Sequence, residues 1–134
     1  MSEHETLMEG RWCFVCGEDN PAGLRTTWRL TEDGRARTSF VPTRQQEGWR
    51  GIVHGGILAA LCDEAMAQRL RLAGIRAVTA TLTVRYLKPV PVGASLIVEG
   101  ELLEERSRAC RLRASILDPD GTCYAQADAL CVRR

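Results

Sequence analysis

The amino-acid sequence predicts an α+β domain in which a curved antiparallel β-sheet wraps around one long central helix. Several stretches have the apolar patterning of strands, but only residues 55–73 have the periodicity of a long helix. Short turns join consecutive strands, which is typical of antiparallel pairing. Because one helix cannot cover both faces of a flat sheet, a sheet that curves around the helix buries more apolar surface. We therefore expect one domain over residues 13–134.

The elements follow one another in a simple order. Residues 1–12 are polar and predict a flexible N-terminal arm. The turn Glu32-Asp33-Gly34 predicts a hairpin, and Gly74 ends the helix. Strands are expected at residues 23–31, 36–41, 76–88, 95–105, 108–118 and 122–132.

The clearest strand is residues 76–88, because its apolar and polar side chains alternate. One face is predicted to carry Ala80, Leu82, Val84 and Tyr86. The other is predicted to carry Thr79, Thr81, Thr83 and Arg85.

The predicted helix has two dissimilar sides. The side expected to face the sheet is a broad apolar arc formed by Ile57, Leu58, Leu61, Cys62, Ala65, Met66 and Leu72. On the opposite side, small residues surround Asp63, with Leu70 nearby. A solvent-facing helix surface normally carries more charged residues. We therefore expect a ligand or a second subunit to pack against Asp63.

Composition excludes several classes of protein. Hydrophobic residues make up 45% of the 134-residue chain, and the formal net charge of +1 gives no general attraction to nucleic acid or anionic lipid. The acidic N-terminus is unlike a secretory signal, and no apolar run approaches the roughly 18 residues of a membrane span. These features predict a cytoplasmic protein.

The six cysteines are expected to be free thiols, because that compartment is reducing. Cys13 and Cys16 form a single CxxC pair. A structural zinc site usually has four ligands, and the sequence offers no second pair, although His4 could add a third ligand. We expect a reduced, metal-free pair that packs the N-terminal arm.

The stretch His54-Gly55-Gly56 stands where the helix begins. The first N–H groups of a helix lack partners within it, and glycine lets another molecule approach them closely. The stretch is therefore either a tight connection into the helix or a site that polarises a carbonyl oxygen. Asp63 lies about 12 Å further along the same helix, too far to act on that carbonyl. A two-fold dimer would bring the acid of one subunit to the glycine of the other.

Three segments carry a resemblance to a known family: "CFVCGEDNPAGL", "GWRGIVHGGILAALCDEAM" and "TATLTVRYLKPVPVG". They resemble the hotdog-fold acyl-CoA thioesterases, in the branch similar to the 4-hydroxybenzoyl-CoA and phenylacetyl-CoA thioesterases. The resemblance covers roughly residues 13 to 132. It implies a hotdog fold, a homodimer that often pairs into a tetramer, and active sites shared between subunits.

The resemblance also implies roles for individual residues. Asp63 occupies the position of the catalytic acid, as general base or nucleophile, and the Gly55 N–H polarises the thioester carbonyl. Thr79 falls where a hydroxyl helps to hold the attacking water, and His54 is an orienting residue. The implied reaction is hydrolysis of an acyl-CoA thioester. Coenzyme A is then part of the substrate, and no cofactor or metal is expected.

Further residues are candidates for binding the substrate. Gly56 adjoins Gly55, and Gln46 and Glu47 are the nearest polar residues ahead of the motif. Cations at strand ends are candidates for the coenzyme A phosphates, or are simply solvated: Lys88, Arg85, Arg106 and Arg108.

Two other functions are compatible with these residues. One is a non-catalytic module that binds acyl-CoA, and the other is a hotdog-type enoyl-CoA hydratase or dehydratase. The sequence does not identify the acyl group, because one chain does not reveal a pocket formed between subunits.

Overall fold

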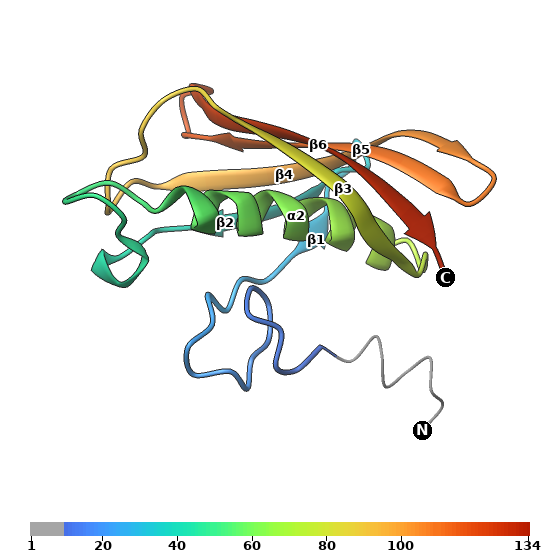
Figure 1. The fold of residues 1–134 in the computed structure, drawn as a ribbon, viewed down its shortest axis with the longest axis horizontal. Coiled ribbons are helices and arrows are strands. Elements are labelled where there is room, and N and C mark those ends of the chain that lie inside the picture. Colours follow the sequence, from blue (N-terminus) through green and yellow to red (C-terminus); the bar gives the residue numbers. More distant parts are fainter. Residues whose placement is uncertain (1–9) are drawn as a thin grey trace.

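A six-stranded antiparallel sheet curves around one long helix in the computed structural model, which describes residues 10–134 (Figure 1). The strands are β1 (Arg29–Leu30), β2 (Ala36–Phe40), β3 (Ala77–Tyr86), β4 (Leu96–Arg106), β5 (Ala109–Leu117) and β6 (Cys123–Arg133). Their order across the sheet is β1-β2-β4-β5-β6-β3. The predicted fold class is confirmed.

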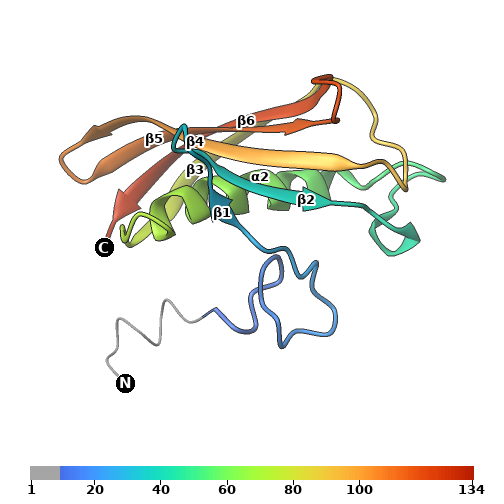
Figure 2. The same cartoon turned by 180° about the vertical axis from the view of Figure 1, so that it is seen from behind.

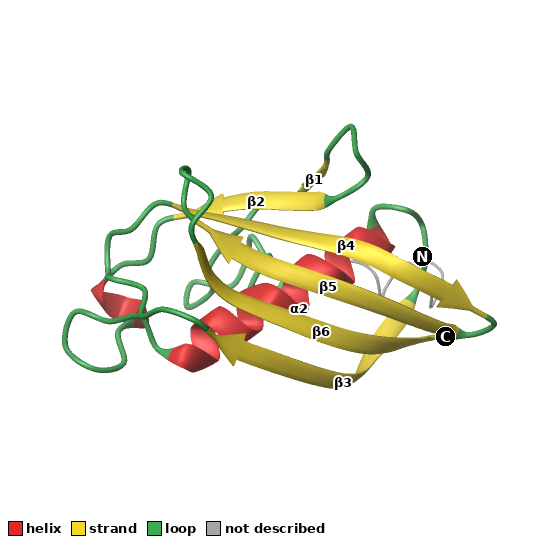
Figure 3. Ribbon diagram, turned by 90° about the horizontal axis from the view of Figure 1, so that it is seen from above, coloured by secondary structure: helices red, strands yellow, loops and turns green. Residues whose placement is uncertain are grey.

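Helix α2 (Gly55–Arg71) occupies the concave side of this sheet, as the view from above shows (Figure 3). Gly74 has a φ of 78°, a left-handed conformation that glycine adopts without strain, and the helix ends just before it as predicted. No helix within residues 10–134 is long and apolar enough to cross a membrane.

The apolar arc of α2 forms the core with the inner faces of the strands. Its buried members are Leu58, Leu61, Cys62, Ala65 and Met66. Leu70, predicted on the opposite side near Asp63, is only 2% exposed and belongs to the core cluster. The chain reverses at Gly74, and Ile75 and Ala77 then pack against the core cluster that includes Leu70.

The helix lies unusually close to the sheet at Gly100 of β4. A Cβ atom at this glycine would stand 2.3 Å from the carbonyl oxygen of Ala65 and 2.5 Å from its carbonyl carbon. Neither backbone atom can move without displacing α2. Gly100 is therefore the residue that permits the observed packing distance between α2 and β4.

The predicted strand over residues 23–31 is the largest departure from expectation. Only Arg29–Leu30 pairs with β2. The preceding backbone bonds elsewhere: the Leu24 N–H donates to the Phe14 carbonyl (2.8 Å), and the Thr26 N–H donates to the Val15 carbonyl (2.9 Å). Arg25, between these two residues, has a φ of 56°, so the segment bonds to the N-terminal turn without forming a regular strand.

The N-terminal turn lies on the side of α2 away from the sheet, in both side views (Figures 1 and 2). Within the predicted flexible arm, residues 1–9 lie outside the described residues. Arg11 is bonded to the turn that follows: its carbonyl accepts from the Asp19 N–H (2.9 Å), and its guanidinium pairs with Asp19 (2.7 Å) and Glu18 (2.8 Å).

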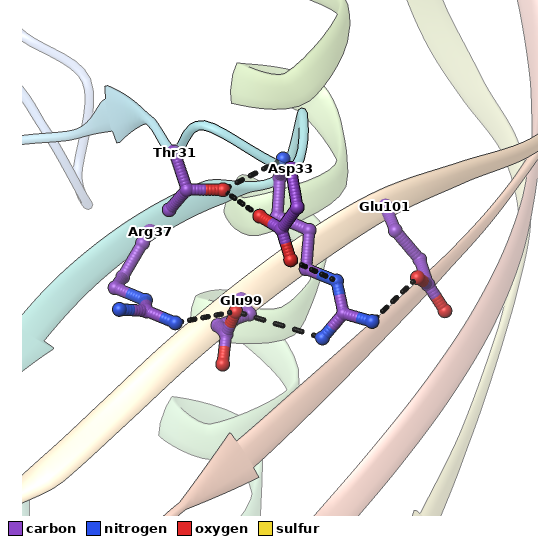
Figure 4. A network of polar contacts seen from close by, with 6 residues as sticks. Thr31, Asp33, Arg37, Glu99 and Glu101 are labelled. Carbon is purple, nitrogen blue, oxygen red and sulfur yellow. Dashed lines mark hydrogen bonds and ion pairs between the residues drawn. The ribbon is translucent and has the colours of Figure 1, made fainter.

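A charged cluster on the outer face ties the first hairpin to β4 (Figure 4). Glu99 points away from the helix, because its neighbours on β4 point toward it, yet it is only 7% exposed. Arg37 (3.1 Å) and Arg35 (3.8 Å) both pair with Glu99, and Arg35 also pairs with Glu101 (3.3 Å). At the turn, Asp33 accepts from the Thr31 hydroxyl, which lowers the pKa of that carboxyl. The predicted hairpin is thus confirmed at its turn.

Replacing Gly100 by alanine should destabilise the protein by about 2–4 kcal/mol, because the new methyl group overlaps the Ala65 carbonyl. Urea unfolding followed by circular dichroism measures this change. Leu103→Ala, on the same strand but at a side chain that is 41% exposed, is the control and should cost less than about 1 kcal/mol. Equal losses in the two variants would contradict the close packing.

Candidate active site at the start of α2

His54 caps the start of α2 with its side chain. Its backbone is extended (φ −60°, ψ 132°), and its Nδ1 accepts a hydrogen bond from the Gly56 N–H at 2.8 Å. Because Nδ1 is the acceptor, the neutral ring carries its proton on Nε2. The His54 N–H in turn donates to the Gln46 carbonyl (2.8 Å). His54 therefore holds the loop before the helix and the first helical turn together.

The two glycines of the motif have different environments. The Gly56 N–H is satisfied by His54, whereas the Gly55 N–H has no acceptor among residues 10–134. A Cβ atom at Gly55 would lie 3.3 Å from the ring of Tyr86, and the Tyr86 hydroxyl donates to the Gly55 carbonyl (2.8 Å). Gly55 is thus the glycine whose amide is available to an external oxygen.

Tyr86 is a residue of this site that the sequence analysis did not select. It lies at the end of β3, and its position in the predicted strand gave no indication that it would contact the helix start. Its hydroxyl holds the carbonyl of the peptide that joins Gly55 to Gly56, directly after the Gly55 N–H.

A mostly apolar groove of about 270 Å³ adjoins Gly55. Its lining residues are Ile52, Val53, Gly55, Leu58, Tyr86, Leu87, Lys88, Pro89 and Val90. Lys88 is therefore the one predicted cation that lies beside Gly55 within this chain, among the residues described. The groove offers an apolar surface, a backbone donor and a positive charge next to one another.

Asp63 lies two turns along α2 and faces β3. Its side chain is half-buried, and its Oδ1 accepts from the Thr79 hydroxyl at 2.8 Å. The Thr79 hydroxyl also lies 3.8 Å from the Cys131 sulfur. The structure therefore brings together two of the residues that the resemblance selected.

A β-bulge directs Thr79 to this position. The pairing of β3 with β6 shifts between Thr79 and Thr81, so Thr79 pairs with Cys131 and Thr81 with Leu130. The predicted face shared by Thr79, Thr81, Thr83 and Arg85 is consequently wrong at Thr79. The extra residue at Ala80 turns Thr79 toward the helix.

The cysteines beside Asp63 are poor nucleophiles. Burial raises the pKa of the Cys62 thiol to about 12, and the nearby Cys123 and Asp63 add to the rise. Burial also raises the pKa of Cys131, although its contact with Thr79 partly offsets the effect. Both thiols therefore remain protonated at neutral pH.

Gln46 and Glu47 serve the loop before the helix. The Gln46 side-chain oxygen accepts from the Thr43 N–H (2.7 Å) and caps the 3-10 turn η1 (Arg44–Gln46). Glu47 accepts from the Gly51 N–H (2.6 Å). Both side chains stabilise the approach to His54, and a direct contact of either one with substrate stays a prediction.

The predicted arginines lie away from Gly55. Arg85 donates to the Gln126 side chain (2.8 Å) on the outer face of the sheet. Arg106 pairs with Glu104 (3.5 Å), and Arg108 follows it in the turn between β4 and β5. That turn lies beyond the far end of α2 (Figure 1). Within one chain, therefore, these three cations do not join the helix-start groove.

This fold and this arrangement define a hotdog-type thioesterase domain. The family model described as "Thioesterase superfamily" matches residues 50–125, more than half of the chain. The protein belongs to this superfamily.

Individual relatives agree with this assignment. The chain is 33% identical over 93 residues to mouse acyl-coenzyme A thioesterase THEM5, covering 68% of this chain and 37% of the relative. It is 30% identical over 99 residues to THEM4 of Xenopus laevis, covering 70% and 43% respectively. The chain thus spans less than half the length of these relatives.

Solved structures share the fold. The crystal structure of a thioesterase superfamily protein superposes with a TM-score of 0.84 at 28% identity, covering 88% of this chain and 61% of that one. A hypothetical thioesterase from Streptococcus pneumoniae, solved with coenzyme A, has a TM-score of 0.75 at 21% identity, covering 81% and 85%. The PaaI protein of Escherichia coli, from the phenylacetic acid degradation operon, has a TM-score of 0.76 at 22% identity, covering 82% and 84%.

The cap at His54 can be tested by stability. His54→Ala should lower the free energy of unfolding by about 1 kcal/mol, because the Gly56 N–H loses its acceptor. His54→Asn is the control, since asparagine is itself a strong cap and should lose less than half as much. Urea unfolding measures both. If asparagine and alanine are equally destabilising, the ring does not act as a cap.

Proposed function

We propose that this protein hydrolyses acyl-CoA thioesters to a free acid and coenzyme A. The observation that carries the proposal is the Gly55 N–H, which has no acceptor among residues 10–134 and adjoins an apolar groove. A thioester carbonyl oxygen is a suitable acceptor, because negative charge develops on it during attack. The positive end of the α2 dipole adds to that stabilisation.

The attacking group is water, and Asp63 is its proton acceptor. The water oxygen bonds to the carbonyl carbon, and the resulting tetrahedral intermediate expels the coenzyme A thiolate as the carbon–sulfur bond breaks. Asp63 takes a proton from the water and returns it to the thiolate. The leaving thiol has a pKa near that of free cysteine, about 8.5, so it departs without a strong acid. In the alternative, Asp63 attacks first and water then hydrolyses the acyl-enzyme anhydride.

Thr79 supports this role of Asp63. Its hydroxyl bonds to Oδ1 at 2.8 Å, which leaves Oδ2 for the water. The two residues are 16 positions apart in the sequence. Two structures of the S. pneumoniae hypothetical thioesterase carry alanine in place of an aspartate and of a threonine that are likewise 16 positions apart.

The site is formed by two subunits in this proposal. Gly55 and Asp63 are about 12 Å apart along one helix, so a single chain does not bring both to one carbonyl. β3 is an edge strand, with Val78 46% and Tyr86 54% exposed. An edge strand with apolar side chains is suited to pairing with a second copy. A two-fold axis beside β3 places the Asp63 of one subunit near the Gly55 of its partner.

The groove beside Gly55 is assigned to the part of the substrate that adjoins the thioester. Its apolar lining suits an aliphatic chain, and Lys88 offers a positive charge to the phosphates of coenzyme A. Arg106 and Arg108 remain candidates for those phosphates only if a second subunit brings them to the groove. Coenzyme A enters as part of the substrate, and the proposed step uses no cofactor.

Asp63→Asn should lower kcat/KM for acyl-CoA hydrolysis by about 10²–10⁴-fold, because the proton acceptor is lost. Release of free thiol from a panel of aliphatic and aromatic acyl-CoAs measures this change. Asp120→Asn, in the exposed turn before β6, is the matched control and should keep wild-type activity. Full activity of Asp63→Asn on every hydrolysed substrate would exclude Asp63 as the base.

Replacing Gly55 tests the backbone donor itself. Proline is tolerated at the first position of a helix and lacks an N–H, and the extended backbone of His54 is compatible with a following proline. Gly55→Pro should therefore lower kcat by about 10²–10³-fold while the helix persists.

Gly55→Ala keeps the N–H and is the control for the added carbon, which meets the Tyr86 ring. It should retain most of the activity that the proline variant loses. Equal loss in both variants would indicate that space at Gly55, and not its N–H, is what catalysis requires.

A further inference from the structure

The CxxC pair of the N-terminal turn contacts α2 through Glu64. The Cys13 and Cys16 sulfurs and a Glu64 carboxylate oxygen all lie within 4.8 Å of one another, and all three residues are half-buried. The Cys13 sulfur is 3.7 Å from Glu64 Oε1. Glu64 follows Asp63 directly but is turned by about 100° around the helix, so it contacts the N-terminal turn and not β3.

These separations are near those in the coordination sphere of a zinc ion. With a Zn–S bond of about 2.3 Å and a Zn–O bond of about 2.0 Å, tetrahedral angles place sulfur and oxygen about 3.5 Å apart. Two thiolates in the same geometry are about 3.8 Å apart. The Cys13 sulfur and Glu64 Oε1 are already 3.7 Å apart, and the remaining separations, all within 4.8 Å, need only small side-chain shifts to reach these values.

Hydrogen-bond donors already surround these atoms. The Cys16 N–H donates to the Cys13 sulfur (3.5 Å), and the Gln68 amide donates to Glu64 Oε2 (2.7 Å) and to the Cys16 sulfur (3.4 Å). Gln68 is itself almost fully buried. Donors of this kind orient metal ligands. Glu64 Oε1 accepts from the Cys13 thiol, and a metal ion would take the place of that thiol proton.

The turn itself requires glycine after the second cysteine. A Cβ atom at Gly17 would lie 2.4 Å from the Cys13 nitrogen and 2.6 Å from both the Cys13 and the Arg11 carbonyl oxygens. The Gly17 N–H donates to the Cys13 carbonyl (2.8 Å), which closes the turn. Gly17 therefore permits the tight turn that brings the two sulfurs to the same side.

We propose that Cys13, Cys16 and Glu64 bind one zinc ion, with water as the fourth ligand. Soft thiolates select zinc over magnesium or calcium, and binding releases the two thiol protons to solvent. The ion would fasten the N-terminal turn to α2 next to the helical turn that carries Asp63, without taking part in hydrolysis. This proposal replaces the sequence-based expectation of a metal-free pair, because Glu64 supplies the third ligand that the sequence did not reveal.

Cobalt substitution tests the site in the whole 134-residue chain. Reduced protein stripped with a chelator should bind one Co²⁺ per chain and give the visible bands of a tetrahedral ion, with a thiolate-to-cobalt band in the near ultraviolet. Zn²⁺ should displace the cobalt and raise the melting temperature. Since no substrate is involved, the result does not depend on the proposed hydrolysis.

Single variants assign the ligands. Cys16→Ser should weaken the thiolate-to-cobalt band and lower the zinc affinity at least about 100-fold, whereas Glu64→Gln should keep that band and still lower the affinity by a similar factor. Cys123→Ser, a half-buried cysteine outside the cluster, is the control and should bind zinc as the wild type does.

Several results would overturn the proposal. The first is that the reduced wild-type protein does not bind one metal ion per chain. The second is that Glu64→Gln binds zinc as tightly as the wild type. The third is that Cys123→Ser loses as much zinc affinity as Cys16→Ser. If Cys16→Ser does not fold, the Glu64→Gln titration decides alone, because that substitution preserves the shape of the side chain.

Discussion

The contact between α2 and Gly100 of β4 determines where the two adjacent acids of the helix point. A helix that touches the sheet through the Ala65 carbonyl has little freedom to rotate or slide. Successive helical residues are turned by about 100°, so the residues before Ala65 face other directions. Asp63 meets β3, and Glu64 meets the N-terminal turn. The orientation of two adjacent acids thus follows from one glycine on a strand that neither acid touches.

The start of α2 shows how backbone groups alone can form a binding site. The four initial N–H groups of a helix need partners, and His54 satisfies the Gly56 N–H. The Gly55 N–H remains available, and the Tyr86 hydroxyl fixes the peptide that follows it. In the proposed reaction the donor is a backbone N–H and not a side chain. Glycine at position 55 matters there because it lets a substrate approach that N–H closely.

Local features of the fold could be predicted from the sequence. The position of α2, its end at Gly74, its main apolar arc and the antiparallel strands all follow from periodicity and turn residues. The departures depend on partners distant in the sequence. Residues 24 and 26 have strand patterning but bond to residues 14 and 15, and Leu70 joins the core although its position along the helix is near Asp63.

For the candidate site, too, the sequence indicated the residues near the motif but not the contacts made by distant parts of the chain. The motif identified His54, Gly55 and Asp63, but alternation in β3 placed Thr79 on the wrong face, because a bulge leaves no clear mark in the sequence. The sequence analysis also missed the contacts of Tyr86 and Glu64, because both depend on residues far away in the sequence. Their contacts span 31 and 51 residues, and only the folded chain brings these groups together.

Everything in the proposed reaction depends on a site shared by two subunits. Refolding a mixture of Gly55→Pro and Asp63→Asn chains tests this most directly, because each variant damages a different half of the site. Random pairing makes half of the dimers mixed, each with one intact site, so about one quarter of wild-type activity should return. Activity that stays at the level of the separate variants would contradict a shared site.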